Sequence, residues 1–279
     1  MRTLDIKTIE TYKNYLLDEE KAKATIEKYI RDINAFSSWA AEREIDKRTV
    51  LEYKEKLIVS YKPRSVNSIL SSLNSLFDFL GWQDCKVKTI KMQRQIFADK
   101  NKELSKDEYD RLLKAAKDKK NVRLYNLMQT ICSTGIRVSE LRYITVEAVN
   151  SGRANISCKG KMRTVILPKQ LCKLLKTYRK DQKIKSDSVF ISKNGRPLNR
   201  VNIWADMKKL CATAGVDRSK VFPHNLRHLF ARTYYSLERD IVRLADILGH
   251  SSINTTRIYT MESGEVHRRQ IGRMKLLRC

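Results

Sequence analysis

Tyr259 ends a stretch of sequence in which residue types suited to phosphate chemistry follow one another at short spacing. His250 stands nine positions before it in Leu-Gly-His-Ser-Ser-Ile-Asn-Thr-Thr-Arg-Ile-Tyr, and His224-Asn-Leu-Arg227 and Thr-Gly-Ile-Arg137-Val-Ser-Glu-Leu lie upstream. A tyrosine hydroxyl is a poor nucleophile at neutral pH, so its attack on a phosphodiester needs cations around the phosphorus and groups that manage two protons. Two arginines, two histidines and a lysine would supply these, and we therefore expect neither a metal nor another cofactor.

Each of these residues also has an ordinary structural explanation. Arg137 could be one of many surface arginines, His224 could cap a helix, and His250 could be packed in a core. Short motifs of this kind arise by chance often enough that none of them decides alone. Their joint order and spacing is what indicates a site.

The net charge favours a polyanionic partner. The sequence holds 57 Lys and Arg against 31 Asp and Glu, a formal net charge of +26. Neutralising phosphates releases condensed counterions, which favours binding of a basic protein to nucleic acid. A ribosomal protein would more often carry its charge in a low-complexity tail, whereas here the basic residues are spread along patterned segments.

Membrane and secretory signals are missing from the sequence. No apolar run approaches the roughly 20 residues that a membrane span needs, and the first residues lack a signal-peptide core. We therefore expect a cytoplasmic protein without a membrane partner. Its six cysteines form no Cys-x-x-Cys pair, so neither a zinc site nor a disulfide framework is indicated, and reduced thiols are expected.

Residues 1–85 show helical periodicity and no strand signal. Apolar residues recur at helical spacing in four runs, which predicts a four-helix unit; the runs lie near residues 9–16, 26–36, 50–57 and 66–80. Lys62 and Arg64 stand at the entry to the last helix and are candidate DNA contacts. For any single exposed lysine, simple solvation is the preferred explanation.

Between residues 86 and 104 the periodicity fades and basic residues crowd together. This pattern predicts an interdomain linker, and its charge would suit a segment that lies against DNA. Lys88, Lys91 and Arg94 are the candidate contacts.

Residues 105–279 predict a second domain that is mostly helical. It opens at Ser105-Lys-Asp-Glu108, which has the form of a helix capping box. Helices are expected over about 105–116, 124–135, 169–180, 199–214, 226–237 and 241–248, the last of them capped by Gly249.

Strand signals occur only in the middle of this second domain. Residues 154–158 and 164–167 flank Lys-Gly-Lys-Met-Arg, which predicts a hairpin with a basic tip, and residues 188–191 predict a third short strand. The predicted fold class is therefore mainly α with a small antiparallel β-sheet.

Three motifs in order resemble those of the tyrosine recombinase, or integrase, family. The segment around Arg137 is similar to the family's first arginine box, Pro-His-Asn-Leu-Arg-His-Leu-Phe-Ala to its His-x-x-Arg box, and the segment from Leu248 to Tyr259 to its terminal box. The resemblance covers residues 105–265 strongly. It implies a mixed α/β catalytic domain there and, more loosely, a SAM-like helical core-binding domain over residues 1–85.

The resemblance also implies roles for the motif residues. Tyr259 would attack the scissile phosphate and become a 3′-phosphotyrosine. Arg137 and Arg227 would clamp the nonbridging oxygens, since a planar guanidinium donates two parallel hydrogen bonds. His224 would accept the tyrosine proton as general base, and His250 would hydrogen-bond the phosphate in the transition state.

A hairpin lysine supplies the proton for the leaving 5′-oxygen in this family. Cys-Lys159-Gly is similar to the usual Gly-Lys-Gly, which favours Lys159, but the tip is one residue shorter than usual and Lys161 remains the alternative. Lys161 and Arg163 are otherwise candidate DNA contacts. Glu140 matches an acidic position that buttresses the site, or it is a plain helix-surface carboxylate. His228 is expected to be structural.

The function that the resemblance implies is a site-specific DNA recombinase, acting as a homotetramer on two double-stranded DNA sites with inverted-repeat cores. A type IB topoisomerase or a catalytically silent DNA-binding protein are the alternatives. The helical N-terminal unit and the segment after Tyr259, which would dock on a neighbouring protomer, favour recombination, and the full set of site residues argues against a silent protein. The high charge and atypical hairpin favour integration, excision or resolution of a mobile element over Xer-like dimer resolution; the accessory factors are left open.

Overall fold

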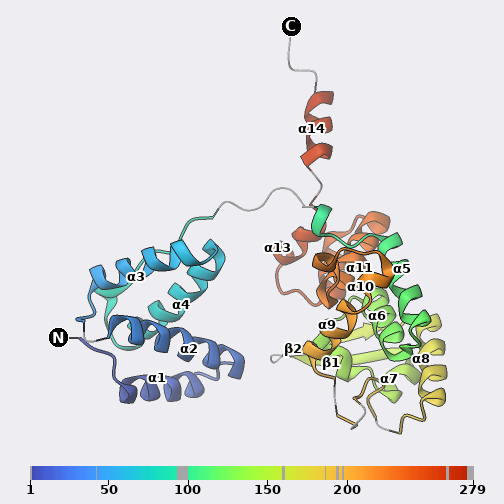
Figure 1. Ribbon diagram of the computed structural model, residues 1–279, viewed down its shortest axis with the longest axis horizontal. Coiled ribbons are helices and arrows are strands. Elements are labelled where there is room, and N and C mark those ends of the chain that lie inside the picture. The colour runs from blue at the N-terminus through green and yellow to red at the C-terminus, as the bar shows by residue number, and fades with distance from the viewer. Residues whose placement is uncertain are drawn as a thin grey trace. The chain divides into compact units, whose positions relative to one another are not determined.

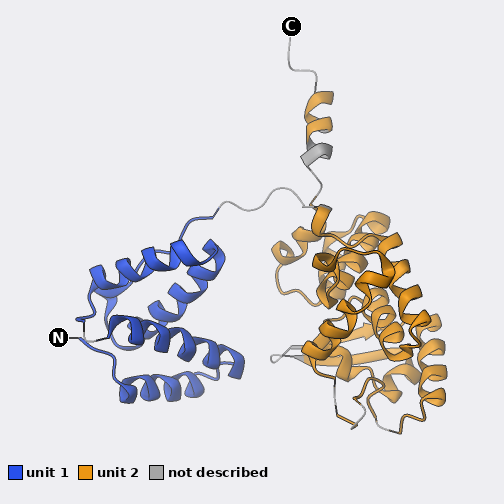
Figure 2. Cartoon of the chain, in the orientation of Figure 1, with its two compact units in different colours: residues 1–94 blue, residues 95–279 orange. Residues whose placement is uncertain are grey.

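The chain forms two compact units, residues 1–94 and 95–279 (Figure 2). The computed structural model describes residues 2–41, 43–92, 100–158, 161–185, 187–192, 195–196, 198–261 and 264–274. Over these residues the secondary structure is mainly helical, with one two-stranded antiparallel sheet (Figure 1). The predicted fold class is confirmed.

The first unit contains the four predicted helices. They are α1 (Ile6–Asp18), α2 (Lys23–Ala40), α3 (Lys47–Ser60) and α4 (Pro63–Phe79), followed by a single 3₁₀ turn, η1 (Gln83–Cys85). Each helix turns an apolar stripe inward, and Tyr12, Phe36 and Phe77 are fully buried in the shared core. Burying a side chain of this size contributes roughly 1.5–3 kcal/mol, so the unit has a core of its own.

The first unit extends beyond the boundary that the sequence predicts. Two asparagines of α4 each pair with the backbone of the segment that follows: Asn74 accepts from Val87 N at 3.1 Å and donates to Val87 O at 2.9 Å, and Asn67 does the same at Ile90, at 2.7 and 2.9 Å. Val87 is buried in the core of the unit. The expected linker over 86–104 is therefore wrong at its first end, because side-chain hydrogen bonds pin this segment to α4.

The other end of the expected linker belongs to the second unit. Leu104 is 1% exposed in that unit's core, and its carbonyl accepts a hydrogen bond from Arg232. Of the predicted DNA contacts, Lys62, Arg64, Lys88 and Lys91 are exposed, whereas Arg94 lies outside the described residues.

The second unit is built mainly from helices around α6 (Figure 1). Its longer helices are α5 (Lys106–Asp118), α6 (Val122–Thr134), α8 (Lys169–Asp181), α9 (Arg200–Lys208), α11 (Pro223–Glu238), α12 (Ile241–Leu248) and α14 (Gly264–Arg273). Shorter ones are α7 (Val146–Ser151), α10 (Cys211–Ala214) and α13 (Ile253–Thr256), with 3₁₀ turns η2 (Lys100–Lys102), η3 (Val138–Tyr143), η4 (Arg218–Lys220) and η5 (Arg257–Tyr259). The predicted capping box at Ser105 is present, since Ser105 and Glu108 cap each other reciprocally.

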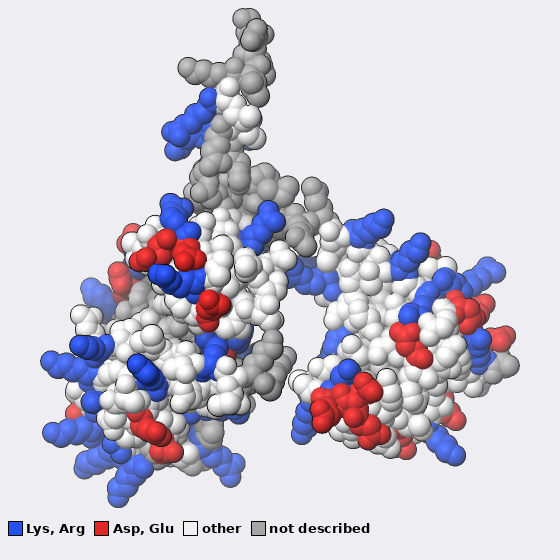
Figure 3. All heavy atoms as spheres, turned by 180° about the vertical axis from the view of Figure 1, so that it is seen from behind, with Lys and Arg blue, Asp and Glu red and all other residues white. Residues whose placement is uncertain are grey.

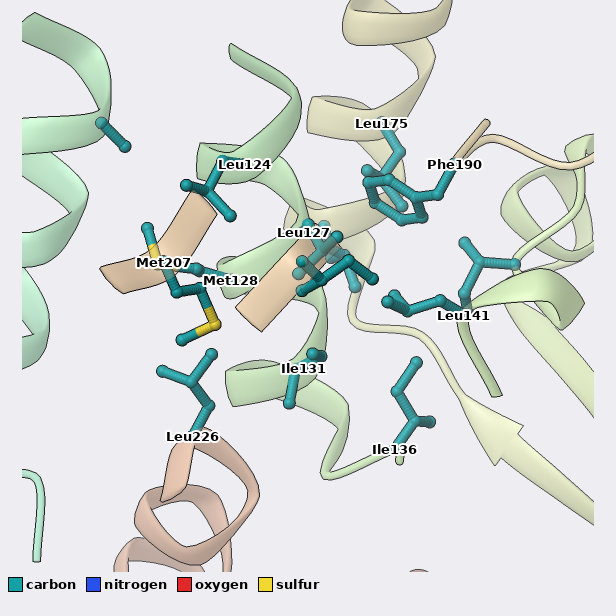
Figure 4. Packing of buried hydrophobic residues seen from close by; sticks show 14 of the residues in the cluster. Leu124, Leu127, Met128, Ile131, Ile136, Leu141, Leu175, Phe190, Met207 and Leu226 are labelled. Carbon is teal, nitrogen blue, oxygen red and sulfur yellow. The ribbon is translucent and has the colours of Figure 1, made fainter. Parts of the chain in front are cut away.

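The core of the second unit surrounds α6 (Figure 4). Leu127, Met128 and Ile131 of this helix are at most 1% exposed and meet Leu226 of α11 and Leu175 of α8. Because α6 and α11 pack against each other, the loop after α6 and the first turn of α11 are held side by side. Those two places carry the first arginine box and the His-x-x-Arg motif.

The predicted hairpin is present, with a tighter tip than expected. Strand β1 (Arg153–Cys158) pairs antiparallel with β2 (Lys161–Ile166), so that Ile156 faces Arg163. Because β2 already begins at Lys161, Arg163 belongs to the strand rather than to the tip.

Two predicted elements differ in the structure. The expected strand over 188–191 is replaced by isolated bridges at Ser188 and Ile191, that of Ser188 to Thr145, and the apolar Val189 and Phe190 between them are buried in the core. The expected helix over 199–214 is two helices, because Leu210 N bonds Met207 O and closes the ladder in a turn.

Basic side chains are distributed over both units. On the face drawn in Figure 3 they are spread out with acidic groups between them, rather than gathered into one tract. No helix among the described residues is long and apolar enough to cross a membrane. Among the described residues, Cys85, Cys132, Cys172 and Cys211 are free thiols.

Candidate active site

The three sequence motifs converge in the second unit. Arg137 follows the C-terminus of α6, His224 and Arg227 lie in the first turns of α11, His250 follows α12, and Tyr259 ends η5. Arg137, His224 and Arg227 line one cavity of about 530 Å³. Its remaining lining residues are Ile136, Val138, Ser139, Arg200, Val201, Trp204, Phe222 and Pro223.

Arg227 is a buried cation held almost entirely by carbonyl groups. Its side chain is 1% exposed; Nη1 donates to Gly135 O, and Nη2 donates to Leu248 O at 2.8 Å. No carboxylate of the described residues lies within ion-pairing distance, and its Nε is buried without a hydrogen-bond partner there. Burial, and then Arg137, lower the pKa of Arg227 to about 10, so it stays protonated at neutral pH. A buried guanidinium with unused donors is suited to bind an anion.

Two glycines shape the carbonyl groups that hold Arg227. Gly135 caps α6 and Gly249 caps α12, with φ of +66° and +64°. A Cβ at Gly135 would come within 2.4 Å of the Phe230 ring, so a side chain is excluded by space as well as by backbone conformation. The carbonyl groups at the ends of both helices therefore face Arg227, and the predicted C-cap at Gly249 is present.

The tautomer of His250 follows from its partners. An arginine can only donate, so His250 Nε2, which lies 2.9 Å from Arg227 Nη2, is the acceptor. Nδ1 then carries the proton and donates to Thr256 Oγ1 at 2.9 Å. Burial, followed by the charges of Arg227, Arg137 and Arg163, lowers the pKa of His250 to about 4. In this arrangement His250 is neutral, and donation from Nε2 to a phosphate first requires a proton there.

Tyr259 lies beside Arg227 and is 4% exposed. Its ring stacks on His250 with centroids 6.1 Å apart, and His228 meets it edge-on at 4.8 Å and 87°. The phenol packs in a small apolar cluster with Leu244 and Leu248, and its oxygen is close enough to raise the pKa of Arg227 against the effect of burial. The candidate nucleophile and the buried cation are therefore neighbours.

The two histidines of α11 connect the cavity to Tyr259. His224 is exposed on the first turn and meets His228 edge-on, with ring centroids 4.5 Å apart and an interplanar angle of 69°, and His228 in turn contacts the Tyr259 ring. Although the side chain reaches solvent, the surrounding protein partly desolvates the His224 ring, and this desolvation, followed by the charges of Arg227 and Arg137, lowers the pKa of His224, so that it is neutral and able to accept a proton. Burial, and then His224, lower the pKa of His228 to about 3. His228 is thus a packed neutral ring, in agreement with the structural role predicted for it.

Glu140 is a buried acid that holds two arginines. It is 1% exposed; Oε2 accepts from Arg137 N at 2.7 Å, and Oε1 accepts from Arg137 Nη1 at 3.0 Å. Arg163 Nη2 donates to Oε2 at 2.7 Å. The helix-surface alternative for Glu140 is therefore wrong, because the carboxylate faces inward at the start of η3. The Arg137 side chain is 40% exposed, so its free donors remain accessible from the cavity.

Arg163 does not lie where a DNA contact is expected. Its side chain is 15% exposed, and its two terminal nitrogens bond Glu140 and, at 2.6 Å, Ile247 O. The predicted DNA contact at Arg163 is therefore wrong, because both terminal nitrogens of this arginine bond other residues of the second unit. Lys159 lies outside the described residues, as does the side chain of Lys161, so the hairpin lysine stays a prediction.

Some residues of the site were not predicted. Thr256 is fully buried and fixes the His250 ring, but a threonine six positions after a histidine is no recognisable signal. Arg200 and Trp204 of α9 line the cavity. The sequence gives only a weak signal for Trp204 as a site residue, because α9 has no apolar stripe from which a buried or exposed face could be predicted. In the structure Val201 and Trp204 are 63% and 44% exposed.

Comparison with known proteins decides the family. The model of the phage integrase family matches residues 102–265, and the model of the phage integrase N-terminal SAM-like domain matches residues 9–84. The chain belongs to the phage integrase family. It is a site-specific tyrosine recombinase that acts on DNA, which confirms the predicted family, fold and enzyme class.

The recombinase resembles its relatives over nearly its whole length. Tyrosine recombinase XerA of Pyrococcus furiosus is 30% identical over 289 residues, which cover 99% of this chain and 96% of that protein. Tyrosine recombinase XerD of Vibrio cholerae is 27% identical over 86% of each chain. Among solved structures, a lambda integrase dimer bound to a COC′ core site has a TM-score of 0.75 at 18% identity, covering 94% of this chain and 97% of that one.

Proposed function

We propose that this recombinase cuts DNA with Tyr259 and that Arg227 and Arg137 hold the phosphate during the cut. The observation that carries this proposal is the buried Arg227, which has an unused Nε donor, lacks a carboxylate partner among the described residues, and lies beside the tyrosine. A scissile phosphate would supply the missing negative charge. The partly exposed Arg137 would bind it from the cavity side.

The proposed reaction is a transesterification. The Tyr259 oxygen attacks phosphorus, the bond from phosphorus to the 5′-oxygen breaks, and the 3′ end remains attached as a phosphotyrosine. His224, neutral because of its depressed pKa, takes the tyrosine proton, and a lysine of the hairpin, Lys159 or else Lys161, protonates the leaving oxygen. Because the phosphotyrosine preserves the energy of the broken bond, religation to another 5′-hydroxyl needs no ATP.

The partners we propose are double-stranded DNA with inverted-repeat core sites and three further copies of this chain. The net charge of +26 supports the first. A XerH recombinase bound to a palindromic difH substrate and a lambda integrase tetramer bound to a Holliday junction share this fold, with TM-scores of 0.70 and 0.72. A role on DNA also supports the expected cytoplasmic location.

Two biological roles are candidates. The high charge and short hairpin favour integration, excision or resolution of a mobile element. The relatives named XerA and XerD, aligned over 86–99% of this chain, favour a Xer-like role in resolving chromosome or plasmid dimers. Trapping covalent complexes in cells and sequencing the attached DNA would distinguish these roles, because the sites would lie either at the ends of an element or at one chromosomal or plasmid locus.

Tyr259→Phe tests the nucleophile. It should abolish the covalent adduct on a nicked suicide substrate in a denaturing gel, because the attacking oxygen is gone. DNA binding in a mobility-shift assay should be nearly unchanged, since no cation is removed. Tyr235→Phe is the matched control: it removes one hydroxyl from a tyrosine that packs against the same apolar cluster and should cleave like wild type. An adduct formed by Tyr259→Phe would place the nucleophile elsewhere.

A further inference from the structure

Arg163 lies at a junction of three parts of the active site. It is in β2, two residues after Lys161, and its side chain turns inward from the hairpin. Nη2 donates to Glu140 Oε2 at 2.7 Å, and Nη1 donates to Ile247 O at 2.6 Å. The two nitrogens of one guanidinium thus bond two elements distant in the sequence, and they do so from a third.

Each of these three elements carries a residue of the site. The hairpin carries the candidate general acid, Lys159 or Lys161. Glu140 holds Arg137 through both its backbone and its side chain. Ile247 O belongs to the last turn of α12, directly before the Gly249 cap and His250.

The contact with the α12 cap is close as well as polar. The aliphatic part of Arg163 packs on Gly249, where a Cβ would come within 2.3 Å of Arg163 Cδ. The glycine therefore makes room for the arginine stem in addition to permitting the positive φ. Arg163 is also one of the charges that depress the pKa of His250.

We propose that Arg163 is the positioning residue that aligns the lysine-bearing hairpin with the phosphate-binding residues. By bonding Glu140 and Ile247 O at once, it fixes β2, the strand at whose start the lysine-bearing tip ends, relative to Arg137 and His250. A lysine at 163 would keep the charge but could not span both partners, because an ammonium lacks the planar fork of a guanidinium. This inference rests on the proposed function, since it acts through the hairpin lysine.

The experiment compares two scissile linkages in the same protein preparation. Adduct formation is timed on a normal suicide substrate and on one with a 5′-bridging phosphorothiolate, whose sulfur leaves without protonation. The quantity measured is the ratio of the two rates. Both rates scale with the amount of folded enzyme, so a variant that is only less stable lowers both rates together and leaves their ratio unchanged. A change in the ratio therefore reports on protonation of the leaving oxygen.

Arg163→Gln and Arg163→Lys should each raise the thiolate-to-diester ratio at least roughly tenfold above wild type, as part of the 10²–10⁴ that a general acid contributes. Lys159→Ala and Lys161→Ala set the upper end of the scale, and whichever lysine is the acid should show the larger rise. Arg153→Gln is the matched control, since Arg153 is an exposed arginine at the far end of the same hairpin. Its ratio should equal that of wild type.

The outcomes separate the inference from the function on which it rests. If a lysine variant raises the ratio and both Arg163 variants match wild type, Arg163 does not position the acid and the inference is overturned. A wild-type ratio in Arg163→Lys alone would overturn the requirement for the fork, since charge would then suffice. If wild-type protein forms no adduct on either substrate, the proposed function fails instead.

Discussion

The candidate DNA contacts of the first unit and the candidate catalytic residues of the second unit hold their charges in opposite ways. In the first unit the candidate DNA contacts Lys62, Arg64, Lys88 and Lys91 are all exposed. In the second unit Arg227 and Glu140 are each 1% exposed, and every terminal nitrogen of Arg227 has a defined partner. Water solvates the first set of charges, whereas hydrogen bonds to the surrounding protein hold the second set in place.

This difference has a physical cause. Exposed ion pairs contribute about 0–1 kcal/mol, so one surface cation can substitute for another at little cost. Breaking a buried charged network costs roughly 3–5 kcal/mol, because it leaves a charge without compensation. We therefore expect binding to depend on the number of cations in the first unit, and catalysis to depend on the shape of each cation in the second.

The largest expected effect is that of Arg227→Lys. An ammonium cannot satisfy Gly135 O, Leu248 O and His250 together, so cleavage should fall by roughly 10²–10³, the usual cost of losing one oriented donor to the transition state. The free energy of unfolding should also fall by about 1–3 kcal/mol for a buried acceptor left unpaired. Single-turnover cleavage and urea denaturation measure the two effects.

The matched control for Arg227→Lys is Arg64→Lys at the exposed entry to α4, which should change neither quantity measurably. Equal cleavage by Arg227→Lys and Arg64→Lys would erase the distinction between the units, because charge alone would then be enough in both.

The parts of the fold set by local pattern were predictable from the sequence. Helical periodicity located α1 to α4, and the glycine after Leu248 marked the end of α12. The motif spacing predicted that Arg137, His224 and Arg227 lie together, and they line one cavity. These features depend on residues a few positions apart, where sequence carries the information.

The features that were not predicted depend on distant partners. Arg163 looked like an exposed hairpin cation, and what turns it inward is a carboxylate 23 positions earlier and a carbonyl 84 positions later. The segment after Cys85 looked like a linker, because nothing local shows that Asn67 and Asn74 will bond its backbone. In both cases the deciding hydrogen bonds exist only after the chain has folded.

An intermediate effect concerns acid stability. All four histidines lie in the second unit, and His228 has a pKa of about 3 in the fold against an ordinary value near 6.5. As pH falls below 6.5, His228 is protonated in the unfolded chain but stays neutral in the fold, so the free energy of unfolding decreases toward pH 3. His250, with a pKa of about 4, acts in the same direction between pH 6.5 and 4.

His228→Asn should make this loss of stability less steep. Each histidine that stays neutral in the fold contributes a slope of up to about 1.4 kcal/mol per pH unit, and the variant removes one of them. Urea denaturation at pH 7, 6 and 5 gives the slope, which is compared between variant and wild type irrespective of their absolute stabilities. An unchanged slope would mean that His228 is protonated in the fold and that the cluster around Tyr259 admits charge.

The smallest expected effect is on the salt dependence of DNA binding. Lys88 and Lys91 are exposed on a segment whose backbone Asn74 and Asn67 pin to α4, so their positions are defined even though their side chains are free. If both lysines contact phosphates, Lys88→Gln with Lys91→Gln should lower the slope of log binding constant against log salt concentration by about 0.9 for each lost contact. Fluorescence anisotropy titrations between about 50 and 200 mM salt measure this slope.

The control pair, Lys7→Gln with Lys13→Gln on α1, removes the same net charge from another exposed part of the first unit. A smaller change in the control would show that the pinned segment lies along the DNA. Equal changes would show that only net charge matters, and no change in the first pair would assign Lys88 and Lys91 to a solvated face.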